Sequence, residues 1–514
     1  MVAKKRYAAL AASMLLLTGA VLGCSTGKDS NNAGPSPSGA PKKEETRTEN
    51  KEPVKITVAM EGSGKPAPQD DFIKKALDEK LNIDLQMTMI QGFNDYMNQI
   101  KVRTAAGNYP DIMHLDLVTL NDFAQKGLLL DLTPYLDSKL QTAKDFMGES
   151  LLKKGMVNGK YYAITRIADV AFTSFWIRQD WLDHLKLEMP TNLEELYEVA
   201  KAFIENDPDG NGKKDTYGFT GTELGTFAPI FGAFGTAGPG TTFLKDGKVV
   251  NSFYVPGMEE ALAYIKRLIS ENLVDPQIMT NKGTMARDQA FQGKAGIIWS
   301  GWTDMGKVEF VEQYKTINPE AEWVQMGPPE GPYGQYDTAF DAEKPSRLFA
   351  LPKTLEKQPD KLEKIFELLN YISSKEGNRL VMYGIEGRHY NVENGKIVLT
   401  EAMAKEGNYF HYYQMTGRPN EEYLPTKFPT EEKFIEYALK LPRLQSIDSN
   451  LLPPAGYNAA DADRYAKEEL AKFLYNKRPL EEYPDFIKTL ESSFKYKLFV
   501  EQAEKRAKEL GLVQ

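Results

Sequence analysis

Cysteine and histidine are scarce in this sequence. Its 514 residues contain one cysteine, Cys24, and four histidines. A single cysteine excludes an intramolecular disulfide and a cysteine-ligated zinc site, so the fold must be stable from its packed core alone. His-Glu-x-x-His and Gly-x-Ser-x-Gly are also absent, which removes the signatures of zinc proteases and serine hydrolases.

Positive charge and long apolar runs are also in short supply. Lys and Arg number 63 against 72 Asp and Glu, for a formal net charge of -9. An acidic chain does not attract nucleic acid, so we expect no such partner. Beyond the N-terminal segment no apolar run approaches the ~18 residues of a membrane helix. A carbohydrate-active enzyme stays an alternative, because a glycosidase needs only two carboxylates ~5–10 Å apart.

The N-terminus is typical of an exported lipoprotein. Lys4, Lys5 and Arg6 precede the apolar stretch 7–22, which is shorter than the ~20 residues of a spanning helix. Residues 1–23 are therefore predicted to be a signal peptide. Cys24 follows Gly23 in a pattern similar to a lipobox, which predicts a diacylglyceryl thioether on Cys24 and an anchor in the outer face of the cell membrane. An ordinary cleaved signal with an accidental cysteine is the alternative.

A polar tether is expected next. After Cys24, residues 25–52 contain no aromatic residue and no Leu, Ile or Val. Such a segment cannot bury enough apolar surface to order itself, so residues 24–52 are predicted to be a lipidated cysteine and a disordered tether. The remaining chain is longer than the ~250–300 residues at which single cores divide, which predicts at least two lobes.

Strand and helix patterns alternate along the rest of the chain. "VKITVAM" reads as a strand, and "DDFIKKALDEKLNIDLQMTMI" reads as a helix followed by a strand. Thr191 and Glu194 form a capping-box pattern before the helical run 193–206. The alternation predicts α/β lobes with mainly parallel sheets.

Several motifs together resemble one family. "FWIRQDWLDHLKLEMPTNLEELYEVAKAFIENDPDGNGKKDTYGF" is similar to a stretch of family 1 extracellular solute-binding proteins of ABC importers, in the subgroup of large Gram-positive lipoproteins. "GNYPDI", "GLLLDLTPYL", "NGKYYAITR", "FQGKAGIIWSGW" and "YGIEGRHY" follow the family order. Together these matches extend from about residue 55 to residue 390.

The resemblance implies a periplasmic-binding-protein-like fold of class II, with two discontinuous α/β lobes, hinge strands and a ligand cleft. Lobe 1 is expected at 53–167 plus 346–387, and lobe 2 at 168–345 plus 388–514, with crossings near 165–170, 344–349 and 385–390. The implied function is a monomeric, non-enzymatic receptor that delivers an oligosaccharide to an ABC permease. The alternatives are a secreted hydrolase or lyase, or a sugar-sensing adaptor for a sensor kinase.

A calcium site is expected in the segment "DPDGNGKKDTYG". Asp207, Asp209 and Asn211 alternate, Gly212 allows a sharp turn, and the Lys213 carbonyl and Asp215 follow. Loop position 12 is Gly218 instead of the Glu of a sensor EF-hand, so we expect structural calcium. A similar loop in alginate-oligosaccharide-binding proteins of the family supports this reading, although Thr216 stands where they have Glu. An ion-free turn rich in Asp and Asn is the alternative.

Ligand contacts are expected just past the strands, where α/β sheets hold their ligands. Trp302 follows the strand "AGIIW" and aligns with a sugar-stacking tryptophan of maltose-binding protein, so it is the first candidate. Some candidates carry a structural alternative: core packing for the tryptophans, a hinge ion pair for Arg166 with Asp169, and a structural role for His389. The full set is Trp302, Trp299, Arg166, Asp169, Glu61, Ser63, Asp116, Arg388, His389 and Tyr390.

Overall fold

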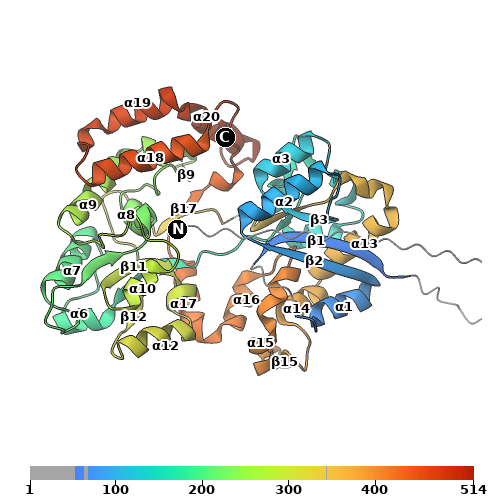
Figure 1. Ribbon diagram of the computed structural model, residues 1–514, viewed down its shortest axis with the longest axis horizontal. Coiled ribbons are helices and arrows are strands. Elements are labelled where there is room, and N and C mark those ends of the chain that lie inside the picture. Colours follow the sequence, from blue (N-terminus) through green and yellow to red (C-terminus); the bar gives the residue numbers. More distant parts are fainter. Residues whose placement is uncertain (1–51, 63–67, 343) are drawn as a thin grey trace, which may run out of the picture. The chain divides into compact units, whose positions relative to one another are not determined.

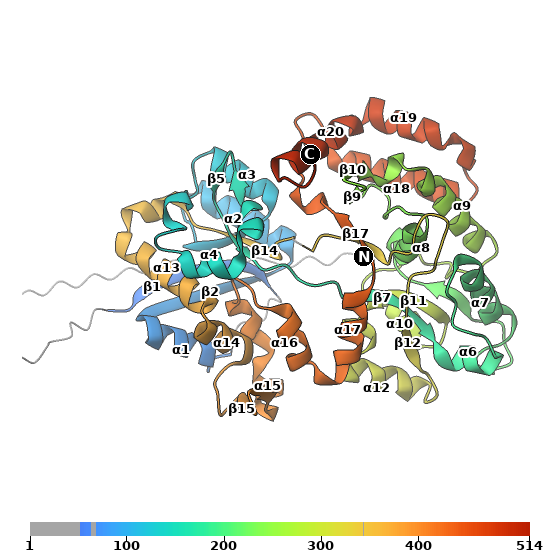
Figure 2. The ribbon, with the colours of Figure 1, turned by 180° about the vertical axis from the view of Figure 1, so that it is seen from behind.

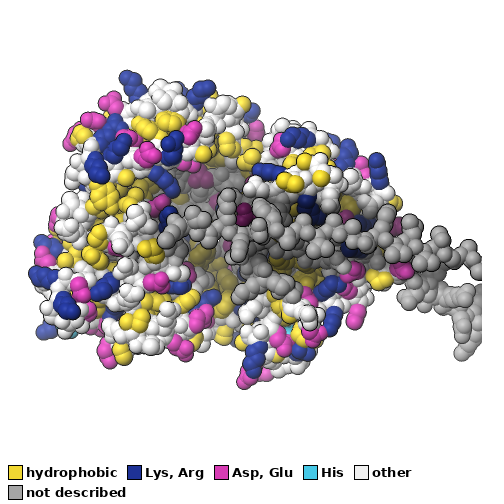
Figure 3. Space-filling view, viewed as in Figure 1, with side chains coloured by type: hydrophobic (Ala, Val, Ile, Leu, Met, Phe, Trp, Pro, Cys, Tyr) yellow, Lys and Arg dark blue, Asp and Glu magenta, His cyan; other side chains and the backbone are white. Residues whose placement is uncertain are grey.

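A computed structural model describes residues 52–62, 68–342 and 344–514. The predicted signal peptide, Cys24, most of the predicted tether and the candidate Ser63 lie outside these ranges. None of the helices within them is both long and apolar enough to span a bilayer. Figure 3 shows Lys and Arg side chains next to Asp and Glu on the face viewed, with hydrophobic side chains scattered between them.

The first sheet has five strands in the order β2-β1-β3-β14-β6. β1 runs parallel to β2 and β3, whereas β14 runs antiparallel to both β3 and β6. The strands are β1 (Val54–Gly62), β2 (Ile83–Gln91), β3 (Ile112–Leu115), β6 (Ile164–Arg166) and β14 (Arg347–Ala350).

Helices cover both faces of this sheet. Val58 packs in one core with Leu77 and Ile365, and Ala59, its neighbour in β1, packs in another with Tyr96. This alternation is the period of two of a strand buried on both sides. Figure 1 shows α2 and α3 on one side of the sheet and α1 and α14 on the other. The helices are α1 (Phe72–Leu81), α2 (Phe93–Ala105), α3 (Leu117–Gln125), α4 (Gln141–Met147), α5 (Glu149–Lys153), α13 (Pro359–Ser373) and α14 (Lys375–Tyr383).

The second sheet has four strands in the order β12-β7-β11-β8. β11 is parallel to β8 and antiparallel to β7. Its largest core includes Phe175 and Trp181, so Trp181 packs inside the protein. The strands are β7 (Thr173–Arg178), β8 (Tyr217–Thr220), β11 (Ala295–Gly301) and β12 (Trp323–Met326).

A third sheet has four strands in the order β10-β9-β17-β13. They are β9 (Thr242–Lys245), β10 (Lys248–Asn251), β13 (Thr338–Phe340) and β17 (Arg443–Ser446). Figure 2 shows α18, α19 and α20 gathered near β9 and β10. The helices that belong with the second and third sheets are α6 (Gln179–Leu185), α7 (Leu193–Glu205), α8 (Ala228–Ala233), α9 (Pro256–Ser270), α10 (Met285–Phe291), α11 (Trp302–Met305), α12 (Val308–Ile317), α16 (Asn420–Lys427), α17 (Glu432–Lys440), α18 (Ala459–Leu474), α19 (Tyr483–Ser493) and α20 (Tyr496–Glu509).

The segment that follows α14 differs from the expected lobe assignment. It contains the small hairpin β15 (Tyr390–Glu393) and β16 (Lys396–Leu399), α15 (Glu401–Glu406) and the 3-10 helix η5 (Gly407–Tyr413). Met403, Tyr409 and Tyr413 belong to the core of the first sheet, although residues 388–514 were assigned to lobe 2. The aromatic side chains of η5 are the physical reason, since they are buried against that core. The other lobe boundaries stay predictions.

The chain leaves the first sheet again near Gly417. The Ile167 amide donates to the Thr416 carbonyl at 3.1 Å, so this segment runs beside the connection from β6 to β7. Gly417 has a φ of +99°, and a Cβ there would lie 2.6 Å from the Ile167 Cβ. Only glycine satisfies both the backbone angle and this close approach.

Candidate functional site

A cavity of about 440 Å³ opens where β1, β6 and β14 meet η5 and α16. Strand ends and a 3-10 helix supply its walls, so side chains far apart in sequence converge on it. Aromatic, amide, hydroxyl and charged groups are all present. The main lining residues are Met60, Arg166, Asp169, Ser346, Arg347, Phe349, Asn408, His411, Tyr412, Gln414, Arg418, Tyr423, Lys427 and Phe428.

Arg166, at the end of β6, lies deepest among the charged groups. Its side chain is buried, and its guanidinium donates to the Gln414 carbonyl at 2.9 Å and to the Ser346 hydroxyl at 2.5 Å. The nearest carboxylate, Asp169, is exposed and lies 3.6 Å away. Burial lowers the pKa of Arg166 to about 10, and Asp169 offsets only part of this effect. The two predicted residues therefore meet in the cavity and also form the hinge ion pair given as the alternative.

Arg347 begins β14 and joins the same wall. It donates to the Glu61 carbonyl at 2.6 Å and to the Glu61 carboxylate at 3.2 Å. Glu61 was expected to contact ligand, but it is not among the residues that line the cavity, and it pairs with Arg347. The Glu61 carbonyl and the Glu61 carboxylate both accept from the planar guanidinium of Arg347, so the pairing fixes the orientation of that group.

Arg418 and Lys427 enter the cavity from the segment after η5. The Arg418 guanidinium donates to the Gln414 side chain at 2.6 Å and to the Asn420 side chain at 2.9 Å. It also lies 4.0 Å from the centre of the Tyr423 ring. Burial, together with the charge of Arg418, lowers the pKa of Lys427 to about 8. Among the described residues, the Lys427 ammonium has no hydrogen-bond or ion-pair acceptor.

Trp299, near the end of β11, forms a second candidate surface. Its half-buried side chain lines two further cavities, of about 820 and 250 Å³. The indole Nε1 donates to Asp337 at 3.2 Å, and Asp337 is fully buried. Arg443 holds the same carboxylate at 3.2 Å. Burial raises the pKa of Asp337 to about 6. The hydrogen bond from Nε1 to Asp337 therefore fixes one edge of the indole, and the half-buried side chain of Trp299 borders the two cavities.

Trp302 differs from the prediction. It is 2% exposed, begins α11, and packs against Phe428 with ring centres 5.2 Å apart. Its neighbours in the core include Trp176. The turn after β11 directs Trp302 back into the protein, so the strand position that borders a cavity belongs to Trp299. In this structure Trp302 supports Phe428, which lines the 440 Å³ cavity. We call this the cationic cavity, because Arg166, Arg347, Arg418 and Lys427 line it.

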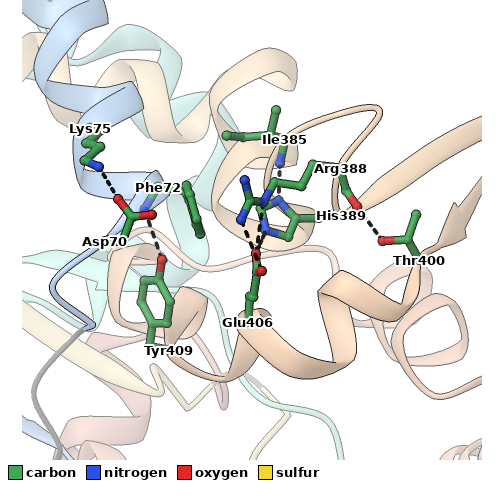
Figure 4. Close-up of polar contacts among 9 residues, drawn as sticks. All are labelled: Asp70, Phe72, Lys75, Ile385, Arg388, His389, Thr400, Glu406 and Tyr409. Carbon is green, nitrogen blue, oxygen red and sulfur yellow. Dashed lines mark hydrogen bonds and ion pairs between the residues drawn. The ribbon is translucent and has the colours of Figure 1, made fainter.

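Arg388 and His389 form an ion cluster away from the cavity (Figure 4). Both side chains contact the Glu406 carboxylate, Arg388 at 3.0 and 3.1 Å and His389 Nε2 at 3.0 Å. The other ring nitrogen of His389 accepts the Ile385 amide at 2.9 Å. Burial lowers the pKa of His389, whose side chain is fully buried. Arg388 also stacks on Phe72, with the guanidinium 3.8 Å from the ring centre.

The remaining candidates in the first sheet region have structural contacts. Tyr390 is buried in the core cluster that contains Trp302. Asp116 is the N-cap of α3, where its carboxylate accepts the Thr119 amide at 2.6 Å. Arg388, His389, Tyr390 and Asp116 do not line the cationic cavity in this structure. His389 therefore fits the structural role given as its alternative, and the other three residues make structural contacts in place of the expected ligand contacts.

The predicted calcium loop is closed by its own hydrogen bonds. Asp207 accepts the amides of Asn211 and Gly212 at 3.1 and 2.9 Å. Lys294 pairs with Asp215 at 2.8 Å. The described residues contain no group of three or more His, Cys, Asp or Glu arranged to hold a metal ion. As arranged, the loop does not present the ~6–8 oxygens that calcium takes.

Arg347, Arg418, Lys427 and Tyr412 were missed by the sequence analysis. Arg347 lies inside the expected second crossing, so its position alone could have marked it. Arg418 follows Gly417, the glycine that the close approach of Ile167 requires. Tyr412 lies in the aromatic-rich stretch "NYFHYYQM", and Lys427 carried no signal, because only packing brings these two residues to β6 and β14.

Comparisons with known proteins agree on the family. A family model described as bacterial extracellular solute-binding protein matches residues 59–379. The chain is 27% identical to lipoprotein LipO of Bacillus subtilis strain 168, over 79% of this chain and 78% of that protein. It is 29% identical to the polygalacturonan/rhamnogalacturonan-binding protein YtcQ of the same strain, over 63% of this chain and 64% of that protein.

A solved structure shows the same fold. It is an HMO-binding, ABC-transporter-associated solute-binding protein from Bifidobacterium longum infantis, with a TM-score of 0.70 at 18% identity. The match covers 90% of this chain and 100% of that one. The fold is therefore α/β and periplasmic-binding-protein-like, with two lobes of class II, as predicted. The family model matches more than half of the chain, and the chain belongs to the bacterial extracellular solute-binding proteins.

Proposed function

We propose that the chain is the receptor of an ABC importer, and that it binds an oligosaccharide and delivers it to the permease. The observation that carries the proposal is Trp299, a half-buried indole that lines two cavities and is fixed by Asp337. An aromatic face suits the apolar face of a sugar ring, and fixed polar groups suit its hydroxyls. A relative named for binding polygalacturonan supports the carbohydrate class.

The proposed mechanism uses ligand-driven closure. The cationic cavity takes polar groups of the ligand, and Trp299 takes the face of a sugar ring. A conformation in which both surfaces contact one ligand gains interactions that an open conformation lacks, so the ligand shifts the population toward it. The permease would then recognise the liganded receptor. We further propose that the mature chain acts as a monomer, tethered through Cys24 to the outer face of the cell membrane.

Binding is tested by thermal shift of residues 53–514 against a panel of neutral and acidic oligosaccharides. We expect one class to raise the melting temperature by several degrees, as mass action requires at saturating ligand. Trp299→Ala should abolish the shift, and Trp299→Phe should retain part of it because the ring remains. No shift with any oligosaccharide would refute the proposal, and degradation of a panel member would favour the enzyme alternative.

Delivery and anchoring need a separate test. Deleting the gene should abolish growth on the identified oligosaccharide, and Cys24→Ala should release the protein into the medium. Wild-type growth of the deletion strain on that sugar would contradict transport. Retention of the Cys24→Ala protein on the membrane would contradict the lipid anchor.

Calcium at residues 207–215 is a further proposal, with a structural role only. Three carboxylates and a carbonyl lie within nine residues, but Lys294 now neutralises Asp215. We expect calcium to raise the melting temperature and to leave oligosaccharide affinity unchanged. Lys294→Met should strengthen calcium binding, and Asp209→Asn should weaken it. Equal melting curves in calcium and in chelator for all three proteins would refute the site.

A further inference from the structure

The cavity at the end of β6 has an unusual charge. Among the described residues, four cationic side chains line it, Arg166, Arg347, Arg418 and Lys427, together with one carboxylate, Asp169. On the face seen in Figure 3, in contrast, Lys and Arg lie next to Asp and Glu. The cavity therefore concentrates positive charge, whereas charges of both signs lie side by side on the face seen in Figure 3.

The internal contacts do not neutralise these cations. Glu61 pairs with Arg347, and the exposed Asp169 lies 3.6 Å from Arg166. Arg418 donates only to the neutral amides of Gln414 and Asn420 among the described residues. Lys427 has no acceptor within the same ranges. Two of the four cations thus have no carboxylate partner in the part of the chain that the structure describes.

Holding the cations together is unfavourable in the free protein. Burial lowers the pKa of Arg166 to about 10 and that of Lys427 to about 8. Nearby positive charges add to both shifts, since Arg347 and Arg418 act on Arg166, and Arg418 acts on Lys427. An anion in the cavity would reverse both effects, because an opposite charge favours the protonated forms. Such stored repulsion is typical of functional sites.

From this arrangement, and resting on the proposed function, we propose that the cavity binds a carboxylate of the oligosaccharide, so the solute is an oligosaccharide that contains uronic acid. Guanidinium forks match a planar carboxylate with two parallel hydrogen bonds. Arg418 and Lys427 supply the unpaired charge. Tyr412, Tyr423 and Phe428 line the same cavity and supply apolar surface for the ring that carries the carboxylate.

The test compares ligands that differ only in charge. Isothermal titration uses residues 53–514 with oligogalacturonates, oligoalginates and glucuronate-bearing xylo-oligosaccharides, each beside its methyl ester and its neutral parent. We expect one acid to bind at least 100-fold more tightly than its ester. Its affinity should fall about tenfold between 50 mM and 500 mM salt, because the interaction is partly screened. Inorganic phosphate and sulfate are titrated alone.

Variants assign the preference to the cavity. Lys427→Met and Arg418→Gln should each weaken the acid by 10-fold or more and weaken the neutral parent by a clearly smaller factor, because the neutral sugar loses a hydrogen bond and no charge pairing. Lys427→Arg should retain most of the affinity. The matched control is Lys497→Met, an exposed lysine on α20. It should bind every ligand as the wild type does.

The outcomes separate this inference from the proposed function. Equal binding of acid, ester and neutral parent would overturn the inference and leave the oligosaccharide receptor intact. Binding of no oligosaccharide would overturn both. Phosphate or sulfate binding as tight as the acid, with no preference among the sugars, would show a simple anion site and overturn the inference. Loss of acid binding in Lys497→Met would also contradict it, because the preference would then not come from the cavity.

Discussion

Removing the charge of Lys427 should make the free protein more stable. The substitution Lys427→Met keeps an unbranched chain of similar length and deletes the half-buried ammonium. The folded pKa is about 8 against a reference of 10.5, so the folded state holds this proton less tightly than the unfolded state does. At 1.36 kcal/mol for each pKa unit, carrying the charge costs the folded protein about 3 kcal/mol at pH 7.

That figure is an upper bound for Lys427. Solvent reaches part of the ammonium and screens it, so we expect Lys427→Met to gain about 1–2 kcal/mol of unfolding free energy. The melting temperature should rise by roughly 2–4 °C. Lys497→Met should change the free energy by less than about 0.5 kcal/mol, because exposed substitutions rarely do more.

The pH dependence gives the sharper assay. Between pH 8 and 10.5 the unfolded chain binds more protons at Lys427 than the folded chain does, so the stability of the wild type rises with pH. Lys427→Met lacks this term, so its advantage should be full at pH 7, fall to about half midway between pH 8 and 10.5, and vanish above pH 10.5. Urea titrations at three pH values measure it. A variant that is less stable than wild type at pH 7 would show that the lysine is compensated, and the reasoning would fail.

Other substitutions give further tests. Asp337→Ala should lower stability by about 3–5 kcal/mol, because it leaves the buried Arg443 without its carboxylate, and calorimetry would show this as a lower melting temperature; an unchanged value would contradict the buried pair. Trp299→Ala should weaken sugar binding at least 10-fold by titration, and it should also lower stability because the indole packs against the core and donates to the buried Asp337; unchanged affinity would remove Trp299 from the site. His389→Ala should lower the melting temperature by several degrees and leave affinity for ligand unchanged, whereas lost affinity at wild-type stability would show a binding role.

The sequence predicted the positions of strands and helices well, and the directions in which side chains point in the folded protein less well. Hydrophobic alternation marked β1, and turn and cap residues marked the start of α7. The cap itself is Asn192, whose side chain accepts the amides of residues 194 and 195, so the predicted capping box was displaced by one residue. Patterns of this kind depend on residues close together in the sequence, so tertiary packing changes them little.

The candidate site shows where local reasoning stops. Arg166 and Asp169 were found because a charged pair at a crossing between lobes is visible in the sequence. Trp302 and Trp299 lie three residues apart, and only the turn after β11 decides which one packs and which one borders a cavity. Lys427 could not be found at all, because its position depends on the packing of α16, whose Tyr423 and Leu424 belong to the core cluster that contains Trp302.

The position of β14 also affects how the chain can fold during export. β14 pairs with both β3 and β6, yet it follows β6 by about 180 residues in the sequence. Until residue 350 has crossed the membrane, β3 and β6 each present an unpaired edge. Exposed edges of this kind invite pairing with other chains. The edges of β3 and β6 therefore stay open to such pairing until about residue 350 of the chain has emerged.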